Sequence, residues 1–210
     1  MTTKLIENSE FIDTGNILEN TVLISKQTFT NDKFLGEEIL DCILAELNFV
    51  NCHFENIDFS MSEFFGCVFT NCKFTNVSFY KCEFWDLIME NCQFKKTELK
   101  RASLTATNEI KLTNCNFVNS DLSSATFSDG KLINCSFVNS NLSAVNFRNL
   151  ELFEPKFDQC NLKPLLGRRV KIWYCREIDR SRDLRDSLEL TNNSDLTTAK
   201  NNTSSNDLKK

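Results

Sequence analysis

The sequence predicts an all-β solenoid built from five-residue repeats, and three observations support this prediction. An apolar residue recurs at every fifth position from Ile24 to Leu162, a second small or apolar column lies two residues before it, and one tetrapeptide returns about every twenty residues. Neither an α-helix nor a β-strand has a period of five, so the repeating unit must combine a short extended segment with a turn. The 210 residues include nineteen Phe and ten Cys but only five Gly, two Pro and one His, a bias typical of repeat proteins.

The first column holds twenty-eight apolar residues, one in each successive repeat, and its spacing is interrupted once. It runs in steps of five from Ile24 to Leu104, slips by three residues, and resumes from Leu112 to Leu162. The slip predicts a short bulge near residues 105–109. Nine of the ten cysteines lie in the second column. Because positions two apart point the same way in an extended chain, each repeat should supply two inward side chains.

Individual repeats resemble the pentapeptide-repeat family, in which a small residue, Asp or Asn, Leu or Phe and two variable polar residues follow one another. Ser-Asp-Leu-Ser-Ser at 120–124 and Ser-Asn-Leu-Ser-Ala at 140–144 match this pattern, and the resemblance covers roughly residues 20–164. It implies a right-handed quadrilateral β-helix with four repeats per coil, here about seven coils. The chain departs from the family pattern in preferring Cys to Ala.

An internal spacing supports four repeats per coil. The tetrapeptide Asn-Cys-x-Phe begins at positions separated by twenty, twenty, twenty-three and twenty residues, and the odd step contains the three-residue slip. These starting positions are Asn51, Asn71, Asn91, Asn114 and Asn134. We therefore expect one side of the coil to carry a stack of inward Phe residues beside a ladder of Asn side chains.

Both ends of the chain lose the repeat. Residues 1–23 are predicted to form an N-terminal cap or degenerate coil, residues 24–164 the β-helix, and residues 165–190 a C-terminal cap, because solenoids commonly cover their edge strands. Loosely spaced apolar residues predict a short helix over about 179–190 in this cap. The polar stretch 191–210 should be disordered. The resemblance also suggests a homodimer formed through the C-terminal cap.

No catalytic or cofactor site is predicted. His53 is the single histidine and lies between the inward residues Cys52 and Phe54, so it should face outward alone. No C-x-x-C pair and no Gly-rich phosphate loop occurs, which argues against zinc and nucleotide binding. We expect a non-enzymatic protein without cofactors.

The sequence shows no signal peptide and no membrane-spanning run, and this predicts a cytoplasmic protein without membrane association. In that compartment the cysteines should act as reduced, small core residues. Stacked cysteines such as Cys52, Cys72 and Cys92 could come within disulfide range, but with strained geometry, so oxidation remains an open alternative.

An exposed apolar patch is the first candidate for function. Outward positions are mostly polar, yet Phe65 and Trp85 should lie one coil apart, with Val68 and Ile88 stacked nearby and Tyr80 close. Such a patch marks either a protein partner surface or a self-association face. The predicted function is therefore an interaction scaffold that binds a protein partner through its outer faces.

Charge distribution suggests the alternative function. Residues 24–162 carry 18 acidic and 12 basic side chains, whereas residues 163–185 carry 3 acidic and 8 basic ones. We interpret the basic segment as a solvated cap rather than a nucleic-acid contact, so no direct nucleic-acid binding is predicted. The resemblance extends to pentapeptide-repeat proteins that imitate duplex DNA and protect DNA gyrase and topoisomerase IV from quinolones or toxins. On that hypothesis the contacts would come from acidic residues at Glu55, Glu63, Asp86, Glu90, Glu109, Asp121 and Asp129.

Overall fold

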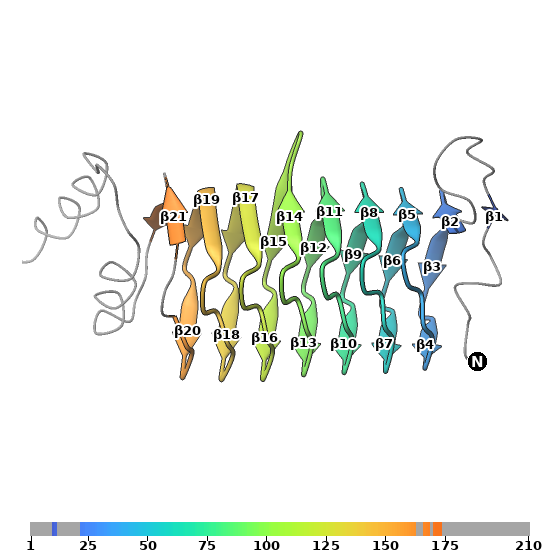
Figure 1. Cartoon of the computed structure of the whole chain (residues 1–210), viewed down its shortest axis with the longest axis horizontal. Coiled ribbons are helices and arrows are strands. Elements are labelled where there is room, and N and C mark those ends of the chain that lie inside the picture. The colour runs from blue at the N-terminus through green and yellow to red at the C-terminus, as the bar shows by residue number, and fades with distance from the viewer. Residues whose placement is uncertain (1–9, 12–21, 163–165, 169, 174–210) are drawn as a thin grey trace, which may run out of the picture.

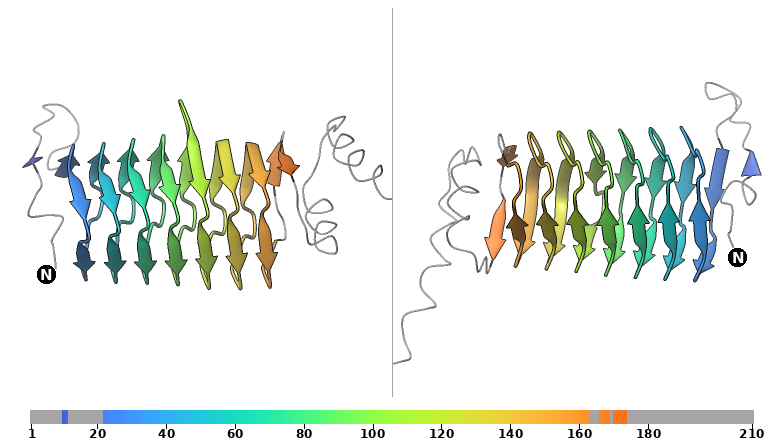
Figure 2. Two further views of the ribbon diagram at one scale, coloured as in Figure 1. Left: turned by 180° about the vertical axis from the view of Figure 1, so that it is seen from behind. Right: turned by 90° about the horizontal axis from the view of Figure 1, so that it is seen from below.

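The chain forms a rod of stacked four-sided coils in which nearly all strands are parallel (Figure 1). The computed structural model describes residues 10–11, 22–162, 166–168 and 170–173. Each coil contributes one short strand to each of three sides and an isolated β-bridge to the fourth. Two further views show the same sides running the length of the rod (Figure 2).

We name the four sides after their central elements. The β8 side contains β2 (Val22–Ser25), β5 (Ile43–Ala45), β8 (Glu63–Phe65), β11 (Glu83–Trp85), β14 (Ser103–Thr105), the first parts of β17 (Thr126–Ile133) and β19 (Asn146–Phe153), and β21 (Leu166–Arg168). The β9 side contains β3 (Thr28–Thr30), β6 (Asn48–Val50), β9 (Val68–Thr70), β12 (Ile88–Glu90), β15 (Ile110–Thr113), the last parts of β17 and β19, and β22 (Lys171–Trp173). The β10 side contains β4 (Lys33–Leu35), β7 (His53–Glu55), β10 (Lys73–Thr75), β13 (Gln93–Lys95), β16 (Asn116–Val118), β18 (Ser136–Val138) and β20 (Lys156–Asp158). The bridge side carries the bridges from Glu38 through Asp58, Ser78, Glu98, Asp121 and Asn141 to Asn161.

The β10 side has seven strands, which confirms about seven coils. Its register pairs Phe54 with Phe74 and Phe74 with Phe94, residues that are twenty apart in the sequence. The predicted β-solenoid with four repeats per coil is therefore confirmed.

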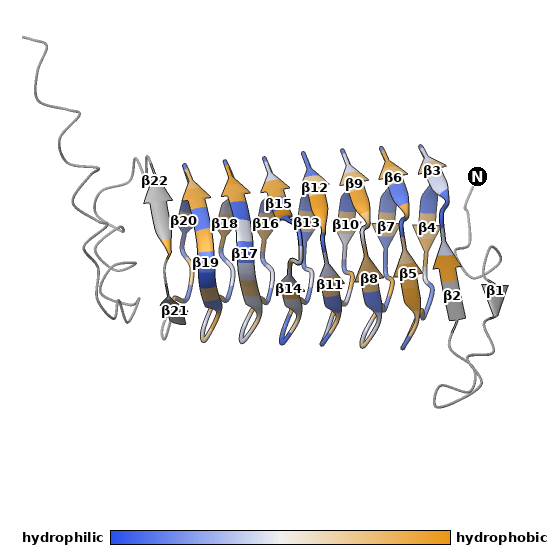
Figure 3. Cartoon of the chain, turned by 90° about the horizontal axis from the view of Figure 1, so that it is seen from above, coloured by the Kyte–Doolittle hydropathy of each residue, from blue (hydrophilic) through white to orange (hydrophobic). Residues whose placement is uncertain are grey.

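The two predicted inward columns form the core. In strands β2 to β20 the central apolar residues are buried, and Figure 3 shows the apolar segments recurring on successive strands. On the β10 side the Phe rings stack almost in parallel, with centroids 4.8 Å apart between Phe54 and Phe74 and 4.7 Å apart between Phe74 and Phe94. Neighbouring strands lie about 4.8 Å apart, so the distance between stacked rings equals the distance between successive coils.

Each corner requires a residue with positive φ. Such a residue directly follows most strands, or lies three positions after a bridge residue, and is most often Asn, as at Asn51 (φ 55°) and Asn71 (φ 55°). Asn and Asp tolerate the left-handed region better than other non-Gly residues because their short polar side chains bond locally. This requirement explains why a chain with only five glycines can turn at every fifth residue.

The predicted Asn ladder is confirmed at the corner between the β9 and β10 sides. The side-chain amide of Asn71 donates to Oδ1 of Asn51 at 3.0 Å, and that of Asn91 donates to Oδ1 of Asn71 at 3.1 Å. The ladder crosses the insertion, because Asn114 donates to Asn91 at 2.9 Å. Repeated amide pairing stabilises the exposed corner without a core contact.

The predicted bulge is a loop of residues 106–109 between β14 and β15 (Figure 1). The register on its far side is undisturbed, since Met89 pairs with Leu112. In the next two coils β17 and β19 run continuously around the same corner. The β8 and β9 sides consequently form one 15-stranded sheet.

The described ends extend the predicted repeat body. At the first coil β1 (Glu10–Phe11) pairs antiparallel with β2, which covers that edge of the β8 side. At the other end β21 and β22 pair in parallel with β19, so coil register continues beyond residue 164 to 173. The predicted helix over 179–190, the dimer contact it would supply and the tail lie outside the described residues. No helix in the described part of the chain could span a membrane.

Candidate interaction surface

Phe65 and Trp85 form an outward aromatic pair on the β8 side. They end neighbouring strands that pair in register, and their rings are nearly parallel, with an interplanar angle of 5° and centroids 6.3 Å apart. Phe65 is 36% exposed, and Trp85 is partly buried. The equivalent positions in the adjacent coils are the small residues Ala45 and Thr105, so the pair stands out from its row.

Val68 and Ile88 join this pair from around the corner. They pair in register on β9 and β12, and both are partly buried. Two residues separate the two rows in each coil, the corner residue Gly66 and buried Cys67 in one and the corner residue Asp86 and buried Leu87 in the next. The structure therefore brings four of the five predicted patch residues to one corner.

Tyr80 lies at the opposite edge of the β8 side. It follows the bridge residue Ser78, and the Lys81 ammonium sits 5.2 Å from its ring centroid. Its carbonyl accepts the backbone N–H of Met61 at 2.9 Å, so Met61 is its neighbour, and Leu40 lies two coils from Tyr80 at the same edge, beyond Ser60. Met61 is 49% exposed and Leu40 42% exposed. Both occupy outward positions of the repeat, so the five-residue period could have identified them.

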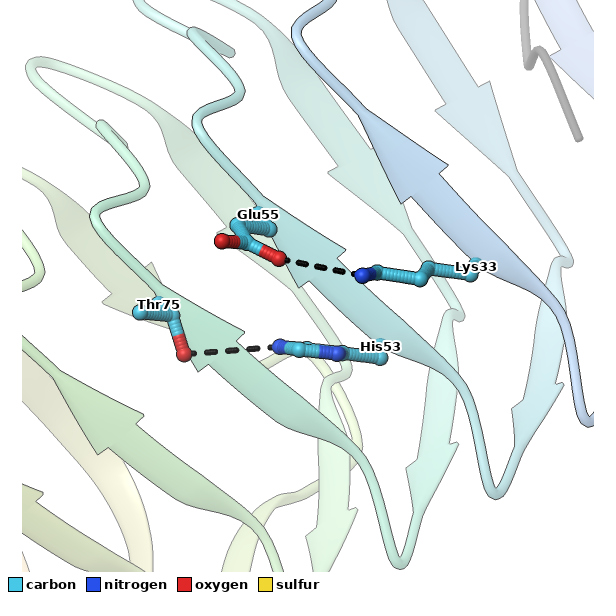
Figure 4. Close-up of polar contacts among 4 residues, drawn as sticks. All are labelled: Lys33, His53, Glu55 and Thr75. Atoms are coloured by element: carbon cyan, nitrogen blue, oxygen red, sulfur yellow. Dashed lines mark hydrogen bonds and ion pairs between the residues drawn. The ribbon is translucent and has the colours of Figure 1, made fainter. Parts of the chain in front are cut away.

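The seven predicted acidic positions do not converge on one surface, although Glu109 and Asp129 line the same groove. Glu55 lies on the β10 side and forms an ion pair with Lys33 at 3.2 Å, beside His53, whose Nε2 lies 3.5 Å from Thr75 Oγ1 (Figure 4). Asp129 accepts from the Asn149 amide at 2.8 Å, and Glu109 lies 4.0 Å from Lys131. The remaining four are distributed over three sides and a corner: Glu63 on β8, Glu90 on β12, Asp121 on the bridge side and Asp86 at a corner.

One column of carboxylates does share a side. Glu38, Asp58, Glu98 and Asp121 occupy successive bridge positions, interrupted by Ser78. Of these only Asp121 was predicted as a site residue. Glu38, Asp58 and Glu98 each directly precede the central apolar residue of every fourth repeat. A search for charged residues that recur every twenty positions would therefore have found them.

Asp86 organises the inserted loop. Its carboxylate accepts hydrogen bonds from the backbone N–H groups of Thr107 (2.9 Å) and Asn108 (2.7 Å), the Thr107 hydroxyl (2.7 Å) and the Asn108 amide (3.0 Å). The N–H of Asn108 and the Thr107 hydroxyl are the main causes that lower the pKa of Asp86 to about 2. Asp86, one of the predicted acidic contacts, therefore uses its carboxylate to hold the loop.

We expect Asp86→Ala to destabilise the protein by about 1–2 kcal/mol, since loop donors lose a charged acceptor. The folded-state pKa lies below the ordinary value of 3.8, so the carboxylate stabilises the fold above about pH 4 and loses this effect as pH falls toward 2. Thermal melts of both proteins at pH 7 and pH 2 test this. The difference in Tm should shrink at pH 2; a difference that stays constant would contradict the assignment.

The described cysteines are core residues, and eight of the nine are buried. The nine described cysteines are free, and burial raises the pKa of the Cys67 thiol to about 12, so this thiol stays protonated. Two open grooves of about 380 and 550 Å³ are lined by neither His nor Cys. Within the described ranges no three His, Cys, Asp or Glu side chains converge as metal ligands.

Comparisons with known proteins agree with the repeat. Residues 49–103 match a family model described as pentapeptide repeats (9 copies), and residues 109–139 and 120–154 match one described as pentapeptide repeats (8 copies). No curated protein matches the chain significantly.

Several solved structures are similar. Full-length QnrB1, a plasmid-mediated fluoroquinolone resistance protein, is 15% identical over 79% of this chain and 94% of its own, with a TM-score of 0.37. HetL, a pentapeptide repeat protein involved in heterocyst differentiation regulation from a Nostoc cyanobacterium, is 9% identical over 70% and 87%, with a TM-score of 0.23. Rfr23 from the cyanobacterium Cyanothece is 17% identical over 65% and 88%, with a TM-score of 0.25.

Proposed function

We propose that this chain, a member of the pentapeptide-repeat family, is a non-enzymatic scaffold that binds a protein partner through an outer face of its solenoid. The observation that carries the proposal is the stacked, outward pair of Phe65 and Trp85 at a corner also lined by Val68 and Ile88. Aromatic side chains dominate binding energy at protein interfaces, whereas a solvent-exposed pair contributes little to folding. The free thiols fit a reducing compartment, and we place the protein in the cytoplasm.

Affinity capture from native lysate tests this proposal. We expect Trp85→Ala to lower partner capture by about tenfold or more, because truncating a central aromatic anchor typically costs about 2 kcal/mol of binding energy. Val138→Ala is the matched control, since Val138 is a partly buried, outward residue at the equivalent strand position on the β10 side. Both variants should melt as the wild type does.

Self-association of the same patch would give a different outcome. In that case light scattering would detect a concentration-dependent oligomer that Trp85→Ala converts to monomer, and no second protein would be captured. Equal capture by wild type and Trp85→Ala would contradict a partner surface at this corner.

A DNA-mimicking protector of gyrase or topoisomerase IV is the second candidate. The column of Glu38, Asp58, Glu98 and Asp121 favours it, because carboxylates repeat along one side of a straight rod. A protector should alter gyrase supercoiling or quinolone-stabilised cleavage at stoichiometric concentrations, and Asp58→Lys combined with Glu98→Lys should abolish that effect. A scaffold for another partner should leave both reactions unchanged.

A further inference from the structure

Two apolar rows border the β8 side in the third and fourth coils. Phe65 and Trp85 form one row, and Met61 and Tyr80, with Leu40 beyond them, form the other. The large apolar residues that are exposed in the described part of the chain are Leu35, Leu40, Met61 and Phe65. Three of these four border the β8 side: Leu40 precedes β5, Met61 precedes β8, and Phe65 ends β8.

Two carboxylates lie between the rows. Glu63 and Glu83 begin β8 and β11 and pair in register, so like charges stand one coil apart. Partial burial and the charges of Glu83 and Asp41 raise the pKa of Glu63. Like charges placed directly opposite each other in a sheet are destabilising.

No ion pair among the described residues neutralises these two carboxylates. Lys81 follows Tyr80 at the adjacent corner, and its ammonium lies over the Tyr80 ring. The arrangement contrasts with Glu55 on the β10 side, which has Lys33 as its partner. A cation supplied from outside would relieve the repulsion between Glu63 and Glu83.

The two apolar rows beside the carboxylates favour a guanidinium over an ammonium as the bound cation. A guanidinium is planar, weakly hydrated, able to stack on aromatic rings and able to donate to two carboxylates at once, whereas an ammonium is strongly hydrated. A nucleic acid would be repelled by the carboxylates, and a purely apolar segment would leave them buried without a partner.

We propose that the β8 side of the third and fourth coils docks an arginine-bearing segment of a protein partner, with the guanidinium between Glu63 and Glu83 and apolar neighbours on the two rows. The inference rests on the proposed scaffold function and adds the chemistry of the partner. It places recognition on the flat side between the rows as well as at the aromatic corner.

A defined peptide tests the chemistry without the natural partner. In a Trp173→Phe background Trp85 is the only tryptophan of the full-length chain, so its fluorescence reports binding at this side. The probe is a peptide of alternating leucine and arginine, and the reference is the same peptide with citrulline in place of arginine. We expect saturable quenching by the arginine peptide with a Kd at least about tenfold lower than for the citrulline peptide.

A matched pair of charge variants locates the site. Glu63→Gln/Glu83→Gln should raise the Kd at least about tenfold, while Glu98→Gln/Asp121→Asn, which removes the same charge from the bridge side, should leave it unchanged. Equal weakening by both double variants, equal binding of the citrulline peptide, or no saturable binding would each overturn the proposal. Partner capture that depends on Trp85 but not on Glu63 and Glu83 would keep the scaffold function and remove this inference alone.

Discussion

Phe74→Asp should abolish folding. The Phe74 ring is 1% exposed and stacks on the rings of Phe54 and Phe94. It also makes edge contacts with two other rings, whose centroids lie 5.5 Å (Phe69) and 5.6 Å (Phe79) from its own. Removing a buried Phe costs about 3–5 kcal/mol, and an unpaired carboxylate in the core adds several more. The sum is comparable to the total stability of a typical domain, about 5–15 kcal/mol.

Lys73→Asp is the control for this experiment. It introduces the same carboxylate one residue earlier on β10, where the side chain is exposed. We expect its circular dichroism and cooperative melt to match the wild type, while Phe74→Asp gives an insoluble or unstructured protein. A soluble Phe74→Asp variant with native circular dichroism would show that the ring is not needed inside the tube.

The fold could be predicted because inward positions obey a strict rule. Because the tube is narrow, each three-residue strand points only its central side chain inward. Parallel stacking of the coils then places residues twenty apart in contact, as with Phe54 and Phe74. The rule also covers the insertion, whose three extra residues are absorbed in the loop 106–109 without changing the register of Phe94 with Phe117. Nothing comparable constrains the ends, where the period is lost.

The surface was predicted less well because closeness along the chain does not give the side of the tube. Tyr80 and Trp85 are five residues apart, but the corner at Lys81 and the strand β11 separate them, so they border opposite edges of one side. The predicted acidic positions are alike in charge but spread over several places in the coil, so they fall on every side. Assigning each residue to its place in the twenty-residue coil would have grouped Leu40 with Tyr80 and Glu38 with Asp58.

Gly130 occupies a position that no other residue should fill. It pairs with Ile110 on β15 and with Leu150 on β19, in an inward column that elsewhere holds Leu47, Cys67 and Leu87. A Cβ atom at Gly130 would lie 2.3 Å from the carbonyl oxygen and 2.8 Å from the Cβ of Ile110. Because the nearest atom belongs to the backbone, no change of side-chain rotamer can relieve the contact.

Gly130→Ala should therefore destabilise the protein by about 1–3 kcal/mol and lower its Tm by several degrees. Gly66→Asn is the matched control: a Cβ there meets only the Glu46 Cγ at 4.0 Å, and its φ of 59° is one that Asn adopts at many corners of this chain. Truncating Ile110 to Ala should not restore the stability of Gly130→Ala, since the carbonyl oxygen remains. A Gly130→Ala protein as stable as the wild type in denaturant melts would mean that β15 and β17 separate at this corner more readily than their pairing implies.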